Sequence, residues 1–343
     1  MESKMRAVVV ARYGGRLEVM ERPVPRPGAG EVLIRVRASG LCSTDLHLLS
    51  GRMNLGDLPR ILGHESAGDI AELGEGVTAW RVGDRVAVAV DVVCGACRHC
   101  LTGQTQRCRS LQRIGFERDG GHAEYVAVPA ANVVGLPDAL TYAAAAILPD
   151  AVACMYHSLI GQGRVGLGQK VLILGVGGLG IHGVQIARLA GAEVIATSRR
   201  PDRLRIAERY GAISLNPATE PLEDRLREWT QGEGVDVVVD NIGTRASVRE
   251  GLNLLRPGGK LLAVAYLDDT FEVPSLLLFR MEQEIIGCRG STRQDLVEVV
   301  RLAGSGRITP VIGACYPLER VEDAVERLES GDLVGRIVLT REG

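Results

Sequence analysis

The sequence lacks the features that would place the protein in a membrane, on nucleic acid or outside the cell. No apolar run approaches the ~20 residues of a membrane-spanning helix. No apolar region typical of a signal peptide follows the N-terminus. Acidic and basic residues nearly balance, with a net charge of −2, so neither nucleic acid nor an anionic membrane is an expected partner. We therefore expect a cytoplasmic protein.

Bulky aromatic residues and lysine are also scarce. The 343 residues include three Phe and two Trp, so any small-molecule pocket should be lined largely by aliphatic side chains. Three of the 40 basic residues are lysines, and because arginine supplies the rest, a single arginine is weak support for an anion site. Hydrophobic residues make up 46% and charged residues 24%, which is typical of a globular protein, and the length allows two domains.

Four of the eight cysteines lie in one short segment, at Cys94, Cys97, Cys100 and Cys108. Without a secretion signal, this spacing indicates thiolate metal ligands in a reducing compartment rather than disulfides. Four sulfur ligands suit a closed, tetrahedral, structural Zn²⁺ site. An iron–sulfur cluster is the alternative, but the position of the fourth cysteine and the lack of a proline after it favour zinc.

The most informative single motif is a glycine-rich loop that follows the apolar residues 171–174. It reads Gly-x-Gly-x-x-Gly, and a helical pattern at 181–190 and a second strand at 193–197 come next. In this context the motif is typical of a dinucleotide site, because glycines let the backbone approach a pyrophosphate at a helix N-terminus. The predicted cofactor-binding residues of the loop are Gly175, Gly177, Gly178, Leu179 and Gly180.

The pattern of the chain changes near residue 140. Residues 6–136 indicate strands and turns, whereas strands and helices alternate from residue 170, which predicts a doubly wound parallel sheet. After the first helix and second strand, the expected elements are a helix at 202–210, a strand at 235–239, a helix at 246–255 and a strand at 260–265. We predict an α/β protein with two domains: residues 1–151 and 291–343 form a β-rich domain, and residues 152–290 form a Rossmann domain.

Two further stretches carry a resemblance to a known family. They are Gly40-Leu41-Cys42-Ser43-Thr44-Asp45-Leu46-His47 and Gly63-His64-Glu65-Ser66-Ala67-Gly68. With the cysteine segment, the glycine-rich loop and the closing Gly335–Leu339, they resemble the zinc-dependent alcohol dehydrogenases of the medium-chain dehydrogenase/reductase superfamily, over essentially the whole chain. The resemblance implies a GroES-like catalytic domain, a Rossmann coenzyme domain, about two Zn²⁺ per chain and a homotetramer or dimer.

The resemblance also implies a catalytic zinc held by Cys42 and His64. The third ligand is commonly a cysteine, and here its position falls on Asp150; some members use a carboxylate there. Cys154 lies close by, where the family usually has Thr, and is the less favoured ligand. Glu65 matches the carboxylate that can approach the metal when water exchanges.

Three more residues match the family's proton-handling positions. Zinc lowers the pKa of a bound alcohol, hydride passes to the nicotinamide, and the released proton has to leave the site. Thr44 is at the hydroxyl relay position, His47 is at the relay imidazole position, and Asp45 resembles the carboxylate that orients the ligand histidine. Three further histidines match no role in the motifs and are expected to be structural or surface residues: His122, His157 and His182.

The end of the second predicted strand bears on the choice of cofactor. NAD-binding proteins usually have Asp or Glu there, but this chain has Ser198, followed by Arg199 and Arg200. Serine and arginine can hydrogen-bond and neutralise a 2′-phosphate, which favours NADP, with NAD as second choice. The resemblance adds further cofactor contacts: Val264, Ala265 and Tyr266 at the nicotinamide, Asn241 on the adenosine side and Arg336 at the pyrophosphate.

Together these features predict a zinc-dependent alcohol dehydrogenase or carbonyl reductase. We expect a medium-sized primary or secondary alcohol and NADP as substrates. An NAD-dependent polyol or other specialised hydroxy-compound dehydrogenase is the alternative. Zinc-free quinone or enoyl reductases share the glycine-rich loop but typically lack the cysteine segment and the Cys42 and His64 motifs. A zinc-containing nucleic-acid-binding module is disfavoured by the balanced charge.

Overall fold

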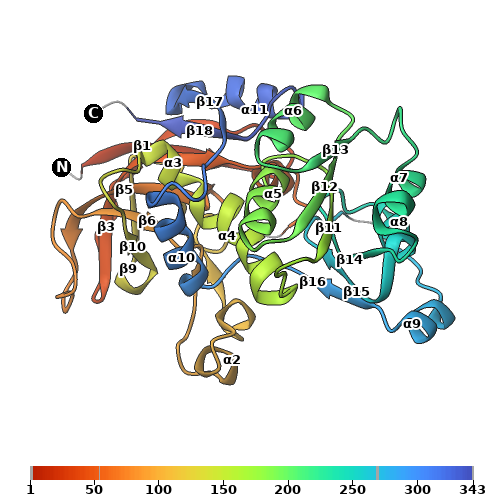
Figure 1. The fold of residues 1–343 in the computed structure, drawn as a ribbon. Helices are drawn as coiled ribbons and strands as arrows, with labels where there is room; N and C mark the ends of the chain where they lie inside the picture. The colour runs from red at the N-terminus through yellow and green to blue at the C-terminus, as the bar shows by residue number, and fades with distance from the viewer. Residues whose placement is uncertain (1–2, 54, 268–269, 342–343) are drawn as a thin grey trace. The chain divides into compact units, whose positions relative to one another are not determined.

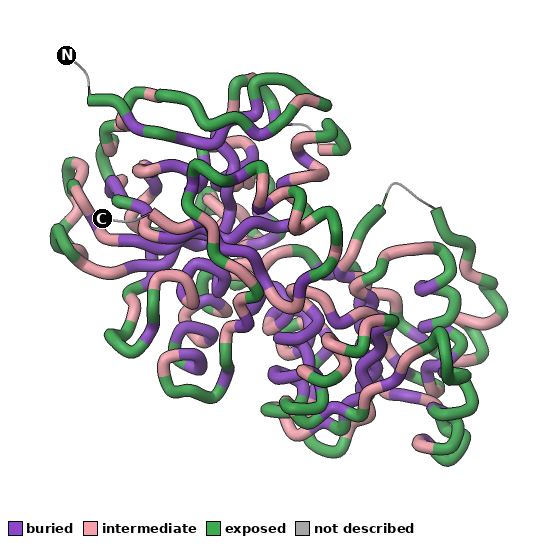
Figure 2. Tube along the Cα trace, turned by 90° about the horizontal axis from the view of Figure 1, so that it is seen from above, coloured by how far each residue is buried: buried purple, intermediate pink, exposed green. Residues whose placement is uncertain are grey.

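The computed structural model describes residues 3–53, 55–267 and 270–341. The chain divides into two compact units. Met1–Ala153 and Gly290–Gly343 form the first, and Cys154–Arg289 form the second. Within each unit, buried residues gather in the interior and exposed residues occupy the outer turns (Figure 2). Within the described residues, none of the helices has the length and apolar character needed to cross a lipid bilayer.

The first unit is built mainly from β-strands (Figure 1). Its largest sheet has the order β10-β6-β5-β3-β18-β17, with β9 also paired to β3. The strands of this sheet are β3 (Glu31–Leu41), β5 (Glu65–Leu73), β6 (Arg85–Val88), β9 (Tyr125–Pro129), β10 (Val133–Gly135), β17 (Ile312–Pro317) and β18 (Arg336–Thr340). Two smaller sheets contain β1 (Lys4–Val10), β2 (Glu18–Pro23) and β4 (Arg60–Ile61), and β7 (Asp91–Val92) and β8 (Gln112–Arg113).

Short helices connect these strands. They are α1 (Ser43–Leu49), α2 (Arg98–Leu101), η1 (Thr105–Arg107), η2 (Ala130–Asn132), α3 (Tyr142–Ala146), η3 (Leu148–Val152), α10 (Arg293–Gly304), η5 (Leu318–Arg320) and α11 (Val321–Glu329). Strand β18 lies antiparallel to β3, with Ile337 opposite Leu41. The C-terminal segment therefore returns beside the strand that leads to Cys42, the first predicted zinc ligand.

The second unit contains a six-stranded sheet of order β13-β12-β11-β14-β15-β16. Every pairing in it is parallel, which confirms the predicted doubly wound sheet. The strands are β11 (Lys170–Leu174), β12 (Glu193–Thr197), β13 (Ile213–Leu215), β14 (Val235–Asp240), β15 (Leu255–Ala263) and β16 (Glu284–Gly287). The central strands are continuous apolar runs because helices cover both faces of such a sheet.

The helices of this region follow the strands in alternation (Figure 1). They are α4 (Ala153–Tyr156), η4 (His157–Gln162), α5 (Gly180–Leu189), α6 (Pro201–Arg209), α7 (Leu222–Thr230), α8 (Arg245–Leu254) and α9 (Ser275–Met281). Leu172, Ile195 and Val238, from three neighbouring strands, share one core with residues of α7 and α8. This rigid sheet fixes the loops at the carboxyl ends of β11, β12 and β14, where a dinucleotide binds in proteins of this architecture.

Candidate functional site

Three of the predicted zinc ligands lie together in the first unit. Cys42 follows β3, His64 precedes β5, and Asp150 belongs to η3. Their ligand atoms all lie within 4.8 Å of one another. His64 Nε2 is 3.7 Å from Asp150 Oδ2, and Cys42 Sγ is 4.0 Å from the same oxygen. Cys42 and His64 are buried and Asp150 is half-buried.

This arrangement fits a zinc ion. Tetrahedral Zn²⁺ with bonds of about 2.0–2.3 Å separates its ligand atoms by roughly 3.3–3.8 Å. The side chains are therefore close to the required spacing. Thiolate, imidazole and carboxylate are accepted zinc ligands, and three of them leave one position open for a substrate. Cys154, the less favoured candidate, is not part of the group found among the described residues.

Local backbone chemistry positions two of these side chains. Cys42 caps the N-terminus of α1: its Sγ accepts the Thr44 N–H at 3.4 Å, and its own N–H donates to Asp45 Oδ2 at 2.8 Å. Gly63, just before His64, has a φ of +99°, and a Cβ there would lie 2.4 Å from the backbone nitrogen of His122. Only glycine allows this turn.

Asp45 lies behind His64, on the side away from Asp150. The Asp45 side chain is fully buried, and its Oδ1 is 3.6 Å from His64 Nδ1. Burial opposes ionisation of Asp45, but the neighbouring His64 and His122 outweigh it and hold the pKa of Asp45 well below its usual range. With Nδ1 of His64 facing a carboxylate, Nε2 is left toward Asp150 and the metal position.

Glu65 and Arg336 form a buried ion pair beside this cluster. Arg336 Nη2 donates to Glu65 Oε1 at 2.6 Å and to Asp150 Oδ2 at 2.8 Å. The Ala151 N–H also donates to Glu65 Oε1, at 3.1 Å. Burial raises the pKa of Glu65 to about 7 against the opposing effect of Arg336. Glu65 is outside the three-residue group, so its approach to the metal stays a prediction, as does the pyrophosphate contact of Arg336.

Thr44 and His47 both lie on α1, the helix whose N-terminus Cys42 caps. Thr44 Oγ1 is 3.5 Å from Cys42 Sγ. His47 is one turn further along the helix and half-buried, and burial together with Arg52 lowers the pKa of its imidazole. The structure thus places Thr44 beside the candidate ligand Cys42 and His47 on the same helix, while their relay role stays a prediction.

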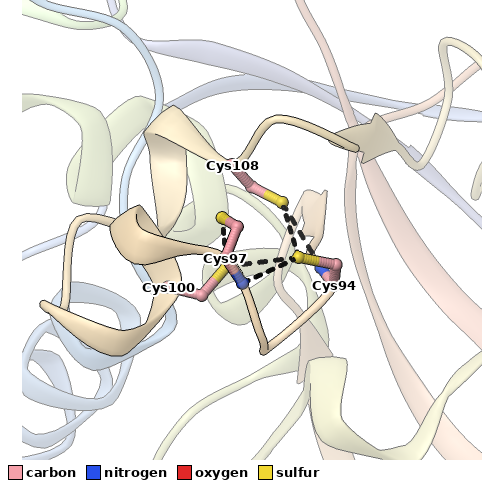
Figure 3. A group of neighbouring side chains, drawn as sticks. All are labelled: Cys94, Cys97, Cys100 and Cys108. Atoms are coloured by element: carbon pink, nitrogen blue, oxygen red, sulfur yellow. Dashed lines mark hydrogen bonds between the residues drawn. The ribbon is translucent and has the colours of Figure 1, made fainter.

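The second candidate metal site is the group of four cysteines. Figure 3 shows their sulfur atoms turned toward one another from α2 and the loops that flank it. All four lie within 4.8 Å of one another; Cys97 Sγ is 3.6 Å from Cys100 Sγ, and Cys108 Sγ is 3.6 Å from Cys94 Sγ. Backbone hydrogen bonds lower the pKa of Cys97 to about 6, which favours the thiolate. Four sulfurs at this spacing fit tetrahedral zinc with no open position.

The glycine-rich loop joins β11 to α5 in the second unit. Gly175 has a φ of +86°. A Cβ on Gly180 would lie 2.2 Å from the Gly175 oxygen, whereas a Cβ on Gly177 would meet no atom within 4 Å. Gly180 is therefore needed for the turn itself, whereas the space next to the Cα of Gly177 is open. Asn241, after β14, donates to the Gly175 oxygen at 3.5 Å, so the structure brings this predicted contact to the loop.

The residues after β12 are those from which we predicted NADP rather than NAD. Ser198 is buried, and its Oγ accepts the Arg200 N–H at 3.2 Å. Arg199 is exposed. The Arg200 guanidinium pairs with Asp202, with Nε 3.1 Å from Oδ1 and Nη2 2.8 Å from Oδ2. The charge next to Ser198 is thus partly neutralised within the chain.

Two residues in these sites have no role in the sequence-based predictions. Asp240 ends β14 and is fully buried; its Oδ1 accepts the N–H groups of Ile242 and Gly243 at 2.9 and 3.1 Å. An acidic residue closing a buried apolar strand is the signal that could have found it. His122 is also fully buried and lies 3.7 Å from Asp45, a contact that only the folded chain creates.

The remaining predicted contacts follow β15. The N–H groups of Val264 and Ala265 donate to the backbone carbonyl oxygen of Asp240 at 3.1 and 3.0 Å, which continues the backbone pairing with β14. Val264 is buried and Tyr266 is exposed. Their contact with a nicotinamide stays a prediction.

Comparison with known proteins independently supports the resemblance to zinc-dependent alcohol dehydrogenases. Residues 28–138 match the family model for the alcohol dehydrogenase GroES-like domain, and residues 178–305 match the model for zinc-binding dehydrogenase. An alcohol dehydrogenase of Geobacillus stearothermophilus is 34% identical, over 98% of this chain and 99% of the relative. An L-threonine 3-dehydrogenase of Pyrococcus horikoshii is 33% identical, over 98% of this chain and 99% of the relative.

A solved structure shares the fold. The cobalt- and zinc-bound thermostable alcohol dehydrogenase of Pyrobaculum aerophilum superimposes with a TM-score of 0.89 at 34% identity. The match covers 99% of this chain and 100% of that protein. The similarity therefore includes both units of the chain.

Proposed function

We infer the chemistry of this protein from one premise: the chain belongs to the zinc-dependent alcohol dehydrogenase family of the medium-chain dehydrogenase/reductase superfamily. It combines a GroES-like domain with a parallel-sheet Rossmann domain and is an alcohol dehydrogenase-type oxidoreductase. Our proposal is that it transfers hydride between a medium-sized primary or secondary alcohol and NADP. The convergence of Cys42, His64 and Asp150 on one point is the observation that carries this proposal.

The side chains divide the work as follows. When bound, zinc supplies a Lewis acid that lowers the pKa of an alcohol hydroxyl. Cys42, His64 and Asp150 would hold the ion, and three protein ligands would leave one position for the substrate oxygen. Oxidation of the alcohol to a carbonyl transfers hydride to NADP⁺ and releases one proton. In the proposed relay, the Thr44 hydroxyl accepts this proton while it donates its own onward, and His47 takes up the relayed proton and releases it to solvent; the lowered imidazole pKa suits this role because a neutral ring can take up a proton.

The cofactor proposal rests on the second unit. Gly175, Gly177 and Gly180 make room for a pyrophosphate at the start of α5. No carboxylate occupies the position of Ser198, and the exposed Arg199 is available to a 2′-phosphate. These features support NADP over NAD. The four-cysteine group is proposed to hold a structural zinc that pins a segment whose Leu101 is 74% exposed and which has little core of its own.

A second candidate is an NAD-dependent dehydrogenase of a polyol or another specialised hydroxy compound. The similarity to a threonine dehydrogenase, at 33% identity, is the observation that favours it. Both candidates share the zinc site and differ in substrate and cofactor. From the family resemblance we also propose a cytoplasmic homotetramer, with a dimer as the alternative.

One experiment tests the proposal. Purified protein is assayed for oxidation of NADPH and NADH over a panel of aldehydes, ketones and keto-acids, and its zinc content is measured. We expect about two zinc ions per chain and a higher kcat/KM with NADPH. In Asp150→Ala we expect about one zinc ion and a loss of activity of at least about 100-fold, since even outer partners of zinc ligands cost 10–100-fold.

Asp138→Ala, which removes a fully exposed carboxylate from the same unit, is the matched control and should change neither quantity. Full zinc content and full rate in Asp150→Ala would show that Asp150 is not a ligand. A clear preference for NADH would refute the NADP proposal, and activity confined to keto-acids or hydroxy-ketones, the oxidised forms of hydroxy-acids and polyols, would favour the second candidate.

A further inference from the structure

The candidate zinc ligand His64 is backed by more than Asp45. The Asp45 carboxylate lies between two imidazoles: Oδ1 is 3.6 Å from His64 Nδ1, and Oδ2 is 3.7 Å from His122 Nε2. Behind His122, its Nδ1 lies 2.8 Å from Ser39 Oγ, and Ser39 Oγ accepts from Arg341 Nη1 at 3.2 Å. Five side chains from separate segments of the first unit thus form one continuous polar path.

The atoms at the centre of this path have only one another. Asp45 Oδ1, His64 Nδ1 and His122 Nε2 are buried and have no hydrogen-bond partner within the part of the chain that the structure describes. Buried polar atoms without partners are costly, so they must be satisfied by the neighbours they face. The three side chains are therefore interdependent: a change in one alters what the others can donate or accept.

The direction of the hydrogen bonds follows from the outer end of the path. Arginine can only donate, so Ser39 Oγ accepts from Arg341. The Ser39 hydroxyl hydrogen then has one acceptor among the described residues, His122 Nδ1. Because Nδ1 accepts, the proton of a neutral His122 ring is on Nε2, which faces Asp45 Oδ2. Burial lowers the pKa of His122 and so favours this neutral ring.

Asp45 connects His122 to His64 and so to the proposed metal position. Asp45 Oδ2 accepts the Cys42 N–H and faces His122 Nε2 at 3.7 Å, so the other oxygen, Oδ1, is the one that faces Nδ1 of His64, at 3.6 Å. His64 then has its lone pair on Nε2, the nitrogen that lies 3.7 Å from Asp150. The opposite tautomer of His122 would instead direct a lone pair at the Asp45 carboxylate, and that repulsion would disturb the carboxylate.

We propose that Arg341, Ser39 and His122 are positioning residues that set the tautomer of His122 and, through Asp45, present His64 Nε2 to the catalytic zinc. The inference rests on the proposed function, because it takes His64 as a zinc ligand. It adds three residues that no sequence motif links to the site. Arg341 follows β18, Ser39 belongs to β3 and His122 precedes β9, so pairing of these strands assembles the path.

The test measures zinc affinity without substrate or cofactor. Each metal-depleted variant is titrated with zinc in competition with a chromophoric chelator. The titration measures the zinc affinity of the weaker of the two proposed zinc sites. We expect His122→Phe, Ser39→Ala and Arg341→Met each to weaken that site about 10–100-fold, the cost typical of losing an outer partner of a ligand. Arg341→Lys keeps a donor and should recover most of the affinity. His157→Phe removes another buried imidazole, from the second unit, and should leave zinc affinity unchanged.

A second measurement needs no variant, and so remains valid if His122→Phe fails to fold. In the wild-type protein, ¹⁵N chemical shifts of the imidazoles should show His122 protonated on Nε2 and unprotonated on Nδ1. A His122 protonated on Nδ1 would overturn the proposal, as would unchanged zinc affinity in both Ser39→Ala and Arg341→Met. Asp150→Ala distinguishes an error in the proposed zinc site from an error in the proposed positioning path. If it also leaves zinc affinity intact, the zinc site itself is wrong; if it alone weakens binding, only the positioning path is wrong.

Discussion

At the scale of single residues, Asp202 pairs with Arg200, a side chain that we propose as a contact for the 2′-phosphate of the cofactor. Its hydrogen bonds from Arg200 lower the pKa of Asp202, so the carboxylate is ionised at neutral pH. A 2′-phosphate at Ser198 would have to share this guanidinium. We predict that Asp202→Asn raises the NADP-to-NAD ratio of kcat/KM about 1.4- to five-fold, the range expected for releasing a surface ion pair worth about 0.2–1 kcal/mol. Steady-state kinetics with both cofactors measure it.

Asp224→Asn is the control for this prediction, because it removes an exposed carboxylate from α7 that is 3.9 Å from Arg227. It should leave the ratio unchanged. A ratio that falls in Asp202→Asn would mean that Asp202 itself supports the cofactor, for example by holding Arg200 in place.

The spacing of the four cysteines was enough to predict that metal site, whereas Cys42, His64 and Asp150 were predicted as ligands through the family resemblance of the motifs around them. Each of the motifs that contain Cys42, His64 and the four cysteines spans only a short stretch of the sequence. The ion pair between Arg336 and Glu65 could not be predicted in this way, because the two residues are 271 positions apart. The contact of His122 with Ser39 spans 83 positions and depends on strand pairing. Long-range polar contacts carry no local signal, and they supply much of the detail of this site.

At the scale of elements, the loop between β11 and α5 offers a matched pair of substitutions. Gly180→Ala places a Cβ 2.2 Å from the Gly175 oxygen, so the turn must shift; we predict a loss of stability of about 1–3 kcal/mol. Gly177→Ala meets no protein atom within 4 Å, so it should fold normally but raise the KM for the cofactor by occupying space needed by the pyrophosphate. Urea unfolding and cofactor kinetics distinguish the two effects.

The opposite result would be informative. If Gly177→Ala bound the cofactor normally while Gly180→Ala unfolded the loop, the glycines would serve the turn alone and the pyrophosphate would lie elsewhere. A threonine at residue 177 would sharpen the comparison, because a larger side chain should raise the KM further without destabilising the protein.

Periodicity predicted the elements of the second unit better than their ends. The strand expected at 193–197 coincides with β12, and the helix expected at 202–210 is α6, Pro201–Arg209. The strand expected at 260–265 is β15, which begins earlier, at Leu255, and continues through Pro257, Gly258 and Gly259. Such residues normally mark a turn; here the pairing of β14 with β15 shifts register between Val235 and Val237, and this irregularity accommodates them.

At the scale of the whole molecule, the proposed ligands divide between the two units. Both metal-ligand groups belong to the first unit, and the glycine-rich loop belongs to the second. A ligand stabilises the folded state by an amount that grows with its concentration, about 2.7 kcal/mol at 100 times Kd. The stabilisation slows amide exchange only for openings that release that ligand. Hydrogen exchange can therefore assign each ligand to a segment of the chain.

We predict that NADP at 100 times its Kd slows exchange at residues 175–180 and 198–202 by up to about 100-fold and leaves residues 91–113 unchanged. Removing zinc with a chelator should accelerate exchange at residues 91–113, because the cysteine segment has little apolar core, and leave residues 175–180 unchanged. Mass spectrometry of peptides from each segment measures both. Cys97→Ser should exchange rapidly at 91–113 even before chelation. If NADP instead protected residues 91–113 alone, the loop after β11 would not be the cofactor site, and the division of ligands between the units would be wrong.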